Sequence, residues 1–486
     1  MNRRNFLGLA IAGSFSLCLP LPGLAGIDLR RGLPLPRAPR LDLNARGIVD
    51  LTAGYGDYDL GSGPRSGALL FNDAWPSPTL TIDTGEVFDL TLFNELDEPT
   101  IVHWHGLTPP ADMDGHPSQI IDPGTSRPYH FTVDDRPGTY WYHPHPHHRT
   151  AFQVYWGMAG FLLVGDGQDE ARGLPTSARD IPLLLADRRV TPGGELMAYN
   201  PTMPEMMVGF LGNTVLVNGR VAPQLEVEPA VIRLRLLNGS TARILNPGFA
   251  DGRNFWLIGT DAGLLEAPIE VNQVLLSPGE RIEILVDLRG QAGASLNLVS
   301  RAFQIAGTHP PAIAQPPQGS AFELMQINVS LPLDGPAGGI PDEFEPMPTI
   351  DSSQAEVRTF TFTQTGPEHF INGLQYVLER IDFTVPLNMV EIWRFINMSN
   401  QPHPMHMHGA HFRVLSRSGP ATPTDAGWKD TVLVRVGETV DVALKFAKPG
   451  LFVFHCHNLE HEDHGMMLNF VVEDEDFIFA DRFQAG

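Results

Sequence analysis

The chain has 486 residues, of which 56 are acidic and 33 basic, and it contains only two cysteines. The excess of negative charge argues against nucleic acid as a partner, and two cysteines exclude a disulfide-rich framework. The length suits about three domains rather than one core. The 48 glycines and 43 prolines, with few runs of helical periodicity, predict short strands joined by turns.

The N-terminal segment predicts export from the cytoplasm. Arg3 and Arg4 precede an apolar run over residues 6–21, and a small-residue cleavage site follows at 23–25. This pattern is typical of a twin-arginine signal peptide, and the run is short for a membrane span. We therefore expect residues 1–26 to be removed after passage through the twin-arginine machinery. The mature protein would be a periplasmic monomer without stable membrane insertion.

Apolar and polar residues alternate in four long runs along the rest of the chain. These runs span 87–96, 231–240, 281–288 and 431–446. Alternation with a period of two is the pattern of a half-buried strand. The sequence therefore predicts an all-β protein.

Two blocks of sequence occur near both ends of the chain. RPGTYWYHPH at 136–145 matches KPGLFVFHCH at 448–457, with the histidines in identical register. A His-x-His-Gly block begins nine residues after Asn94 and again nine residues after Asn397. The sequence around Asn238 repeats the scaffold pattern but carries no histidine. The chain is thus predicted to contain three homologous β units, of which the middle one has no metal ligand.

Stretches rich in proline, glycine and charge separate these units. They lie at about 165–180 and 330–355. We therefore expect the three domains to span 45–165, 178–330 and 355–486.

Eight histidines form four His-x-His pairs, two in the first unit and two in the third: His103, His105, His143, His145, His406, His408, His455 and His457. Residues i and i+2 of a strand point to one face about 6.6 Å apart, which suits one ligand to each of two neighbouring metal ions. The pairs can converge only where the outer units meet. Three metal ions sharing the imidazoles as two, three and three would use every pair.

Imidazole alone suits zinc, copper, iron or nickel, so the remaining residues decide the metal. Cys18 lies in the predicted signal peptide, which leaves Cys456 as the thiol of the mature chain. Its side chain would point to the strand face opposite to its flanking histidines. Two histidines, a cysteine and a distant methionine are the blue-copper ligand set, here His403, Cys456, His461 and Met466. One strand would thus carry the mononuclear copper on one face and the cluster on the other, with Cys456 as the electron path.

Four motifs resemble the copper motifs of three-domain multicopper oxidases, a family that includes laccases, bilirubin oxidases and periplasmic cuprous oxidases. They are HWHG, YHPH, HPMHMHG and HCHNLEHEDHGMM, in the order of the family, and the similarity spans about 45–475. The resemblance implies three cupredoxin-type Greek-key domains and four copper ions per chain. It also implies that one-electron oxidation of four donors is coupled to reduction of O2 to two waters.

The resemblance further implies which residues bind each copper. The type 1 copper matches His403, Cys456, His461 and axial Met466. The type 2 copper matches His103 and His406. The binuclear type 3 site matches His105, His143, His145, His408, His455 and His457.

Two acids and a group of methionines are further candidates. Formation of water consumes four protons, so Asp114 and Glu462 are interpreted as a proton relay rather than as a turn residue and a loop carboxylate. A soft patch of methionines could admit Cu(I), although packing is the preferred interpretation for Met197, Met203, Met206 and Met207. Cuprous oxidases that resemble this chain carry a long Met-rich insert and an acid before the type 1 motif. This chain lacks that insert and has Ser399 and Asn400 there.

These observations predict an exported, laccase-like oxidase that takes electrons from phenols, aromatic amines or low-valent metal ions. A copper-tolerance cuprous oxidase is the alternative enzyme. A two-domain nitrite-reductase-like enzyme is disfavoured, because a single catalytic copper would not use four His-x-His pairs. The non-enzyme alternative is a copper-free scaffold of the cell envelope or of cell division.

Overall fold

The computed structural model describes residues 32–45, 47–61, 63–307 and 316–473. This part of the chain is mostly β, which confirms the predicted fold class. The predicted signal peptide lies outside the described residues. Among the residues that are described, no helix is long and apolar enough to cross a membrane.

Two sheets form the N-terminal part. One has the strand order β1 (Arg40–Asp42), β4 (Thr79–Asp83), β9 (Gly160–Gly165), β8 (Gly138–Pro144) and β6 (Val102–His103). The other has the order β3 (Arg65–Phe71), β2 (Val49–Asp59), β5 (Val87–Asn94) and β7 (Ser126–Thr132). Alternate residues of β5 are buried in one apolar core, among them Phe88, Leu90 and Leu92. This alternation is the pattern expected of a strand with one solvated face.

Two further sheets form the middle part. The larger has the order β12 (Arg220–Val221), β11 (Thr214–Val217), β10 (Asp180–Arg188), β14 (Val231–Asn238), β18 (Arg281–Asp287), β16 (Phe255–Thr260) and β17 (Gly263–Val271). The smaller has the order β13 (Gln224–Val227), β20 (Phe322–Val329), β19 (Ser295–Ser300) and β15 (Pro247–Phe249). All eight residues of β14 are buried, because this central strand is covered on both faces.

The last two sheets hold the C-terminal part. One has the order β22 (Glu368–Ile371), β21 (Glu356–Thr365), β24 (Val390–Asn397), β29 (Thr439–Lys445), β26 (Phe412–Arg417) and β27 (Trp428–Lys429). The other has the order β23 (Phe383–Pro386), β31 (Met467–Glu473), β30 (Gly450–Cys456), β25 (His403–Met407) and β28 (Thr431–Val434). The single predicted run 431–446 is therefore two strands in different sheets, separated by a turn at Gly437, whose φ of +72° favours glycine.

Each of the three parts has an asparagine at the end of an equivalent strand. Asn94, Asn238 and Asn397 end β5, β14 and β24. The Nδ2 of each donates to two backbone carbonyls, one of them four or five residues later in the chain. This shared hydrogen-bond pattern is the structural counterpart of the sequence repeat and ties the strand end to the segment that follows it.

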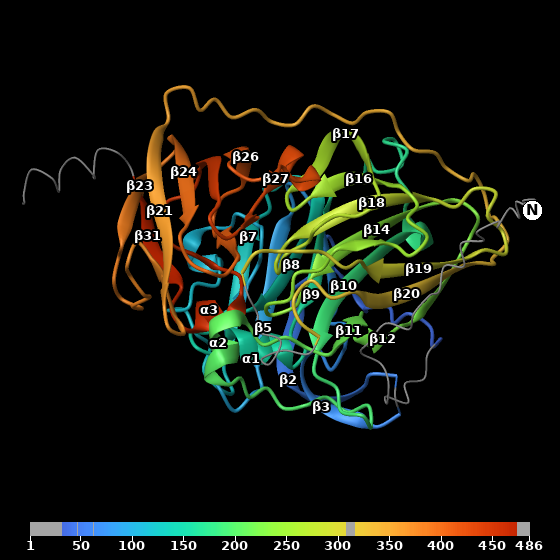
Figure 1. Ribbon diagram of the computed structural model, residues 1–486, viewed down its shortest axis with the longest axis horizontal. Coiled ribbons are helices and arrows are strands. Elements are labelled where there is room, and N and C mark those ends of the chain that lie inside the picture. Colours follow the sequence, from blue (N-terminus) through green and yellow to red (C-terminus); the bar gives the residue numbers. More distant parts are fainter. Residues whose placement is uncertain (1–31, 46, 62, 308–315, 474–486) are drawn as a thin grey trace, which may run out of the picture.

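Three short helices lie together at one side of the molecule (Figure 1). They are α1 (Thr150–Tyr155), α2 (Met203–Val208) and α3 (Leu459–Asp463), and α3 contacts both of the others. Single 3-10 turns occur at Ala111–Met113, Ser177–Arg179 and Pro423–Ala426. The segment 330–355 has no strand or helix and crosses over the sheets as an extended connection (Figure 1). The exact domain boundaries stay a prediction.

Candidate metal centre

The eight paired histidines are all buried, and they converge where the first and third β units meet. In three groups, of which the first two share His105, the ligand nitrogens lie within 4.8 Å of one another: His103, His105 and His406; His105, His143 and His457; His145, His408 and His455. Strand pairing explains the convergence within each unit. In β6 and β8, His103 is directly opposite His143, and in β25 and β30, His406 is directly opposite His455.

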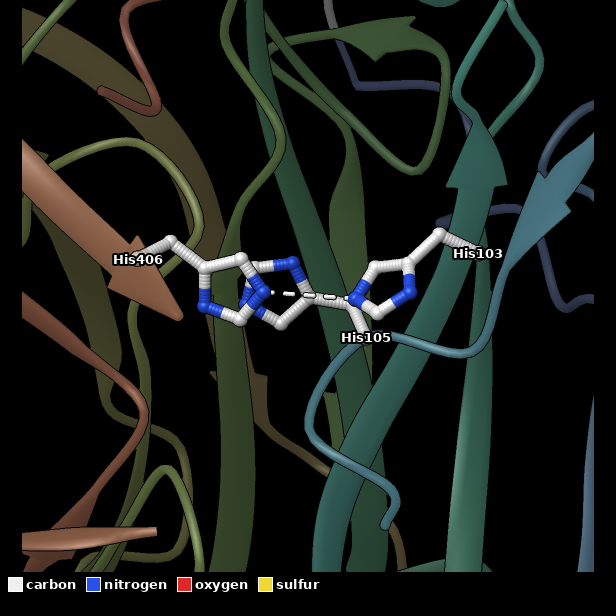
Figure 2. A group of neighbouring side chains, drawn as sticks. All are labelled: His103, His105 and His406. Atoms are coloured by element: carbon white, nitrogen blue, oxygen red, sulfur yellow. Dashed lines mark hydrogen bonds between the residues drawn. The ribbon is translucent and has the colours of Figure 1, made fainter. Parts of the chain in front are cut away.

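The first group joins the two units directly (Figure 2). The Nε2 atoms of His103 and His406 face each other at 3.2 Å. The Nδ1 of His103 lies 2.8 Å from the backbone carbonyl of Asp114, and the Nδ1 of His406 lies 2.9 Å from that of Asp430. A carbonyl can only accept, so the ring protons are on Nδ1 and two Nε2 lone pairs point at each other. Such an arrangement fits a shared cation between the rings.

In the other two groups, ring nitrogens also face one another at short distance. The Nε2 of His455 lies 3.2 Å from the Nε2 of both His145 and His408. The Nε2 of His143 lies 3.4 Å from the Nδ1 of His105, and its own Nδ1 donates to the Pro144 carbonyl at 2.8 Å. Three sets of facing lone pairs therefore surround one small volume. The predicted division of the imidazoles into two, three and three stays a prediction, since His105 lies in two of these groups.

Burial favours the neutral form of seven of these rings. Removal from water lowers the pKa of most of them well below the ordinary value, and the neighbouring imidazoles lower it further, as for His103, His105, His143, His408, His455 and His457. Burial likewise lowers the pKa of His145 to about 3. A neutral imidazole has a free lone pair, which a metal ion requires.

Cys456 lies on the other face of β30, as predicted. Its Sγ is 3.5 Å from the Nδ1 of His403 and 3.7 Å from the Nδ1 of His461, and these two nitrogens are 3.3 Å apart. Met466 and Cys456 belong to the same buried apolar cluster. Burial raises the pKa of the thiol above its ordinary value, so a bound cation would be needed to hold the thiolate.

The outward nitrogens of these two histidines are also covered. Ser399 Oγ lies 2.7 Å from the Nε2 of His403, and the carbonyl of Met207 in α2 lies 3.1 Å from the Nε2 of His461. No sequence motif marks His369, which stacks on His461 with ring centroids 3.8 Å apart. Its Nε2 lies 3.1 Å from the same Met207 carbonyl, so α2 and His369 together cover this centre.

Both predicted acids contact the histidine cluster. Asp114 is fully buried, and its Oδ2 lies 2.6 Å from the Nδ1 of His408. Glu462 is 2 % exposed, and its oxygens lie 3.0 Å from the Nδ1 of His455 and 3.7 Å from the Nε2 of His145. Burial raises the pKa of both carboxyl groups, and for Glu462 the neighbouring His145 opposes that rise. A raised pKa lets a carboxyl group hold a proton close to the cluster.

The methionine group does not pack as predicted. The prediction of core or interface packing is wrong for Met203 and Met197, whose side chains are 60 % and 42 % exposed. Met203 begins α2, a helix of six residues, and its side chain is left in solvent there. Met206 and Met207 are partly buried.

Sequence reasoning also missed a buried ion pair between Arg281 of β18 and Asp430. Asp430 Oδ1 lies 3.0 Å from the Nε2 of His105. Burial alone would raise the pKa of Asp430, but Arg281 and His105 hold it well below its ordinary value. No motif marks these residues, because a lone arginine and a lone aspartate are common in any sequence.

Comparisons with known proteins agree with this geometry. The multicopper oxidase family models match residues 52–169 and 347–476. The multicopper oxidase mco of Staphylococcus aureus is 34 % identical over 88 % of this chain and 89 % of its own length. The laccase of Bacillus subtilis is 30 % identical over 82 % of this chain and 88 % of its own.

Two further relatives bear on fold and function. The cell division protein FtsP of Dickeya dadantii is 32 % identical over 97 % of this chain and 99 % of its own. The crystal structure of the McoA multicopper oxidase of Aquifex aeolicus superposes with a TM-score of 0.83 at 33 % identity, covering 91 % of this chain and 99 % of that one. The fold is thus the cupredoxin-like fold of these oxidases. This chain belongs to the multicopper oxidase family, and it is an oxidoreductase that uses O2 as electron acceptor.

Proposed function

We propose that the protein is an exported, laccase-like oxidase with four copper ions per chain. It oxidises phenolic or aromatic donors, or low-valent metal ions, one electron at a time. When bound, copper supplies an electron acceptor at a mononuclear site and delivers four electrons to O2 at a trinuclear site, where four protons complete two waters.

The completeness of the donor set carries this proposal. The type 1 copper is assigned to His403, Cys456, His461 and Met466. The type 2 copper is assigned to His103 and His406. The type 3 pair is assigned to one group of His105, His143 and His457 and a second group of His145, His408 and His455. The facing lone pairs of these buried rings support the assignment, because without a cation they would repel one another.

Cys456 provides the connection between the two sites. Its side chain lies against the mononuclear ligands, and its backbone continues directly into His455 and His457 on the opposite face of β30. An electron would thus pass through a few covalent bonds rather than across a gap. The short path is the reason to place a thiolate at this position.

Asp114 and Glu462 are assigned to the proton relay. Both contact the group of His145, His408 and His455, with Asp114 beside His408 and Glu462 beside His455. Two buried carboxyl groups with raised pKa can each hold and release a proton near the place where O2 is reduced. Together the two carboxyl groups can deliver two protons at a time, so each must take up a further proton from solvent to supply the four that two waters require.

The surroundings of the type 1 site bear on which electron donors it accepts. A buried type 1 site whose histidine nitrogens are covered by Ser399 and α2 favours donors that give up electrons without entering the copper shell. A laccase among the relatives supports phenolic donors. The exposed Met203 on α2 favours a second candidate, oxidation of Cu(I), because a thioether is a soft ligand.

Donor specificity can be tested on the copper-loaded protein. We would measure kcat/KM for a phenol, Cu(I), Fe(II) and Mn(II) together with O2 consumption. The proposal predicts one O2 consumed for every four electrons and the highest kcat/KM for the phenol. A much higher value for Cu(I) would replace the laccase-like assignment by a cuprous oxidase.

The relative that acts in cell division makes a copper-free scaffold the rival to any oxidase. Copper content and a blue absorption band separate the two, since a scaffold needs neither. Export is tested separately by replacing Arg3 and Arg4 with lysine. The proposal predicts that the wild-type chain loses residues 1–26 and reaches the periplasm, and that the variant stays in the cytoplasm.

A further inference from the structure

The middle β unit carries none of the proposed copper ligands, yet one of its side chains bonds Asp430, which contacts the cluster. Arg281 is the first residue of β18 and is fully buried. Its Nη1 and Nη2 donate to the two carboxylate oxygens of Asp430 at 2.8 and 2.6 Å. This bidentate geometry is the strongest form of an arginine–carboxylate pair.

Asp430 in turn contacts one proposed ligand from each outer unit. Its Oδ1 lies 3.0 Å from the Nε2 of His105, and its backbone carbonyl lies 2.9 Å from the Nδ1 of His406. A carboxylate behind a ligating histidine fixes the orientation of the ring and the nitrogen that carries the proton. Asp430 is therefore placed to orient a ring on each side of the interface.

His105 is turned the opposite way to its neighbours. It presents Nδ1 to the cluster, while six other rings present Nε2: His103, His143, His145, His406, His408 and His455. The reversed ring needs an acceptor for its outward Nε2 proton. Asp430 supplies that acceptor, so the ion pair accounts for the one reversed ring among these seven.

Arg281 is itself held by all three units. Its Nε donates to the Thr139 carbonyl at 2.9 Å, and its Nη2 donates to the Asp261 carbonyl at 2.7 Å. Thr139 lies in β8 of the first unit, Asp261 follows β16 of the middle unit, and Asp430 belongs to the third. Lysine could not replace this planar fork, because its single ammonium group cannot make the bidentate pair and the two carbonyl bonds together.

The ion pair also fits tightly against the backbone that follows His105. A Cβ added at Gly106 would lie 2.5 Å from Arg281 Nη2 and 2.6 Å from Asp430 Oδ2. Gly106 has a φ of +92°, so glycine is required for conformation as well as for space. The pair and the His105 main chain therefore constrain each other.

We propose that Arg281 is a positioning residue for the trinuclear site, through which the ligand-free middle unit fixes His105 by way of Asp430. This inference rests on the proposed copper ligation. The mononuclear site gives an internal reference, because the contacts of Arg281 and Asp430 include none of its four proposed ligands.

The test compares Arg281→Lys with a matched control, Arg235→Lys. Arg235 is also buried in the middle unit, pairs with Asp180 and Glu283, and bonds the side chain of Thr139, but it contacts no proposed ligand. Each protein is loaded with copper and titrated with a chelator. Copper content, the blue band and electron paramagnetic resonance are then recorded on the same sample.

For Arg281→Lys we expect cluster copper to be held about 10- to 100-fold more weakly, the range for loss of a group behind a metal ligand. The blue band should be unchanged, and a new paramagnetic signal should report an uncoupled type 3 pair. Arg235→Lys should keep all three properties. Wild-type cluster affinity in Arg281→Lys, or an equal loss in Arg235→Lys, would overturn the inference.

If Arg281→Lys does not fold, Asp430→Asn is the second variant for the same test. It keeps the side-chain shape but removes the charge that Arg281 pairs with, so the same weakening of cluster copper with an intact blue band is expected. Unchanged cluster copper in Asp430→Asn would overturn the inference. A wild-type protein that binds no copper would instead overturn the proposed function, so the two failures are distinguishable.

Discussion

The two proposed copper sites differ in how many parts of the chain build them. The proposed ligands of the mononuclear site, His403, Cys456, His461 and Met466, all belong to the third β unit. The cluster takes four histidines from the first unit and four from the third, and Arg281 of the middle unit pairs with Asp430 behind it. The mononuclear site therefore takes its ligands from one unit, with only the Met207 carbonyl of α2 added behind His461, whereas the cluster takes its ligands from two units that must be placed correctly relative to each other.

Cys456→Ser should have the largest effect, because it breaks the mononuclear site and the path between the sites at once. Serine offers a harder oxygen donor, so the blue band should disappear. Turnover of a phenol should fall at least about 1000-fold, as when an essential member of a catalytic unit is removed. Absorption, copper content and turnover are measured on one sample, and the cluster copper should remain. A variant that stays blue or turns over normally would show that Cys456 is only structural.

His143→Ala damages the cluster and leaves the mononuclear site intact, because His143 belongs to the first unit. It removes one ring of the cluster but leaves the third unit intact, so the blue band should stay. Copper content should fall and O2 reduction should stop. The type 1 copper should still accept one electron from a donor, which anaerobic bleaching of the blue band would reveal. Loss of the blue band in this variant would mean that the mononuclear site is not independent.

Asp114→Asn should separate proton supply from electron supply. Asparagine keeps an oxygen that can accept from His408, but it cannot hold a transferable proton. We expect reoxidation by O2 to slow about 100-fold, within the range of general acid catalysis, while reduction by the donor is unchanged. Stopped-flow measurement of both half-reactions tests this. Slowed reduction by the donor with normal reoxidation by O2 would show that Asp114 acts at the mononuclear site and not at the cluster.

Ser399→Ala should have the smallest effect, confined to the mononuclear site. The Ser399 hydroxyl donates to Asn397 or Gln401 and so accepts from the Nε2 of His403. Without that acceptor His403 is a weaker ligand for Cu(II), and the reduction potential should rise by tens of millivolts, which corresponds to roughly 1 kcal/mol for one electron. Redox titration of the blue band measures the shift, and cluster reoxidation serves as the control. A lowered potential would contradict the assigned hydrogen bond.

The sequence predicted the all-β fold because alternation is local, and it predicted the convergence of the histidine pairs because two pairs in each outer unit can form one site only where those units meet. Alternation identifies β5 and β14, and two histidines at i and i+2 must share a strand face. The division of 431–446 into β28 and β29 was missed, because alternation continues across the turn at Gly437. Periodicity alone does not distinguish one long strand from two strands in different sheets.

Contacts between units could not be predicted in the same way. Arg281 and Asp430 are 149 residues apart, and neither belongs to a motif. His369 stacks on His461 only because β22 is brought next to α3 by the tertiary fold. The exposure of Met203 likewise depends on where α2 lies on the surface. Ligands with fixed spacing are readable from sequence, whereas the residues that orient them require the structure.

The most direct test of the central claim is the copper content of the mature protein after anaerobic loading and removal of loosely bound metal. Elemental analysis, the blue band and electron paramagnetic resonance would be recorded together. The account predicts close to four copper ions per chain. One of them gives the blue band, and two are magnetically coupled and give no electron paramagnetic resonance signal. A single copper per chain, or zinc in its place, would contradict it.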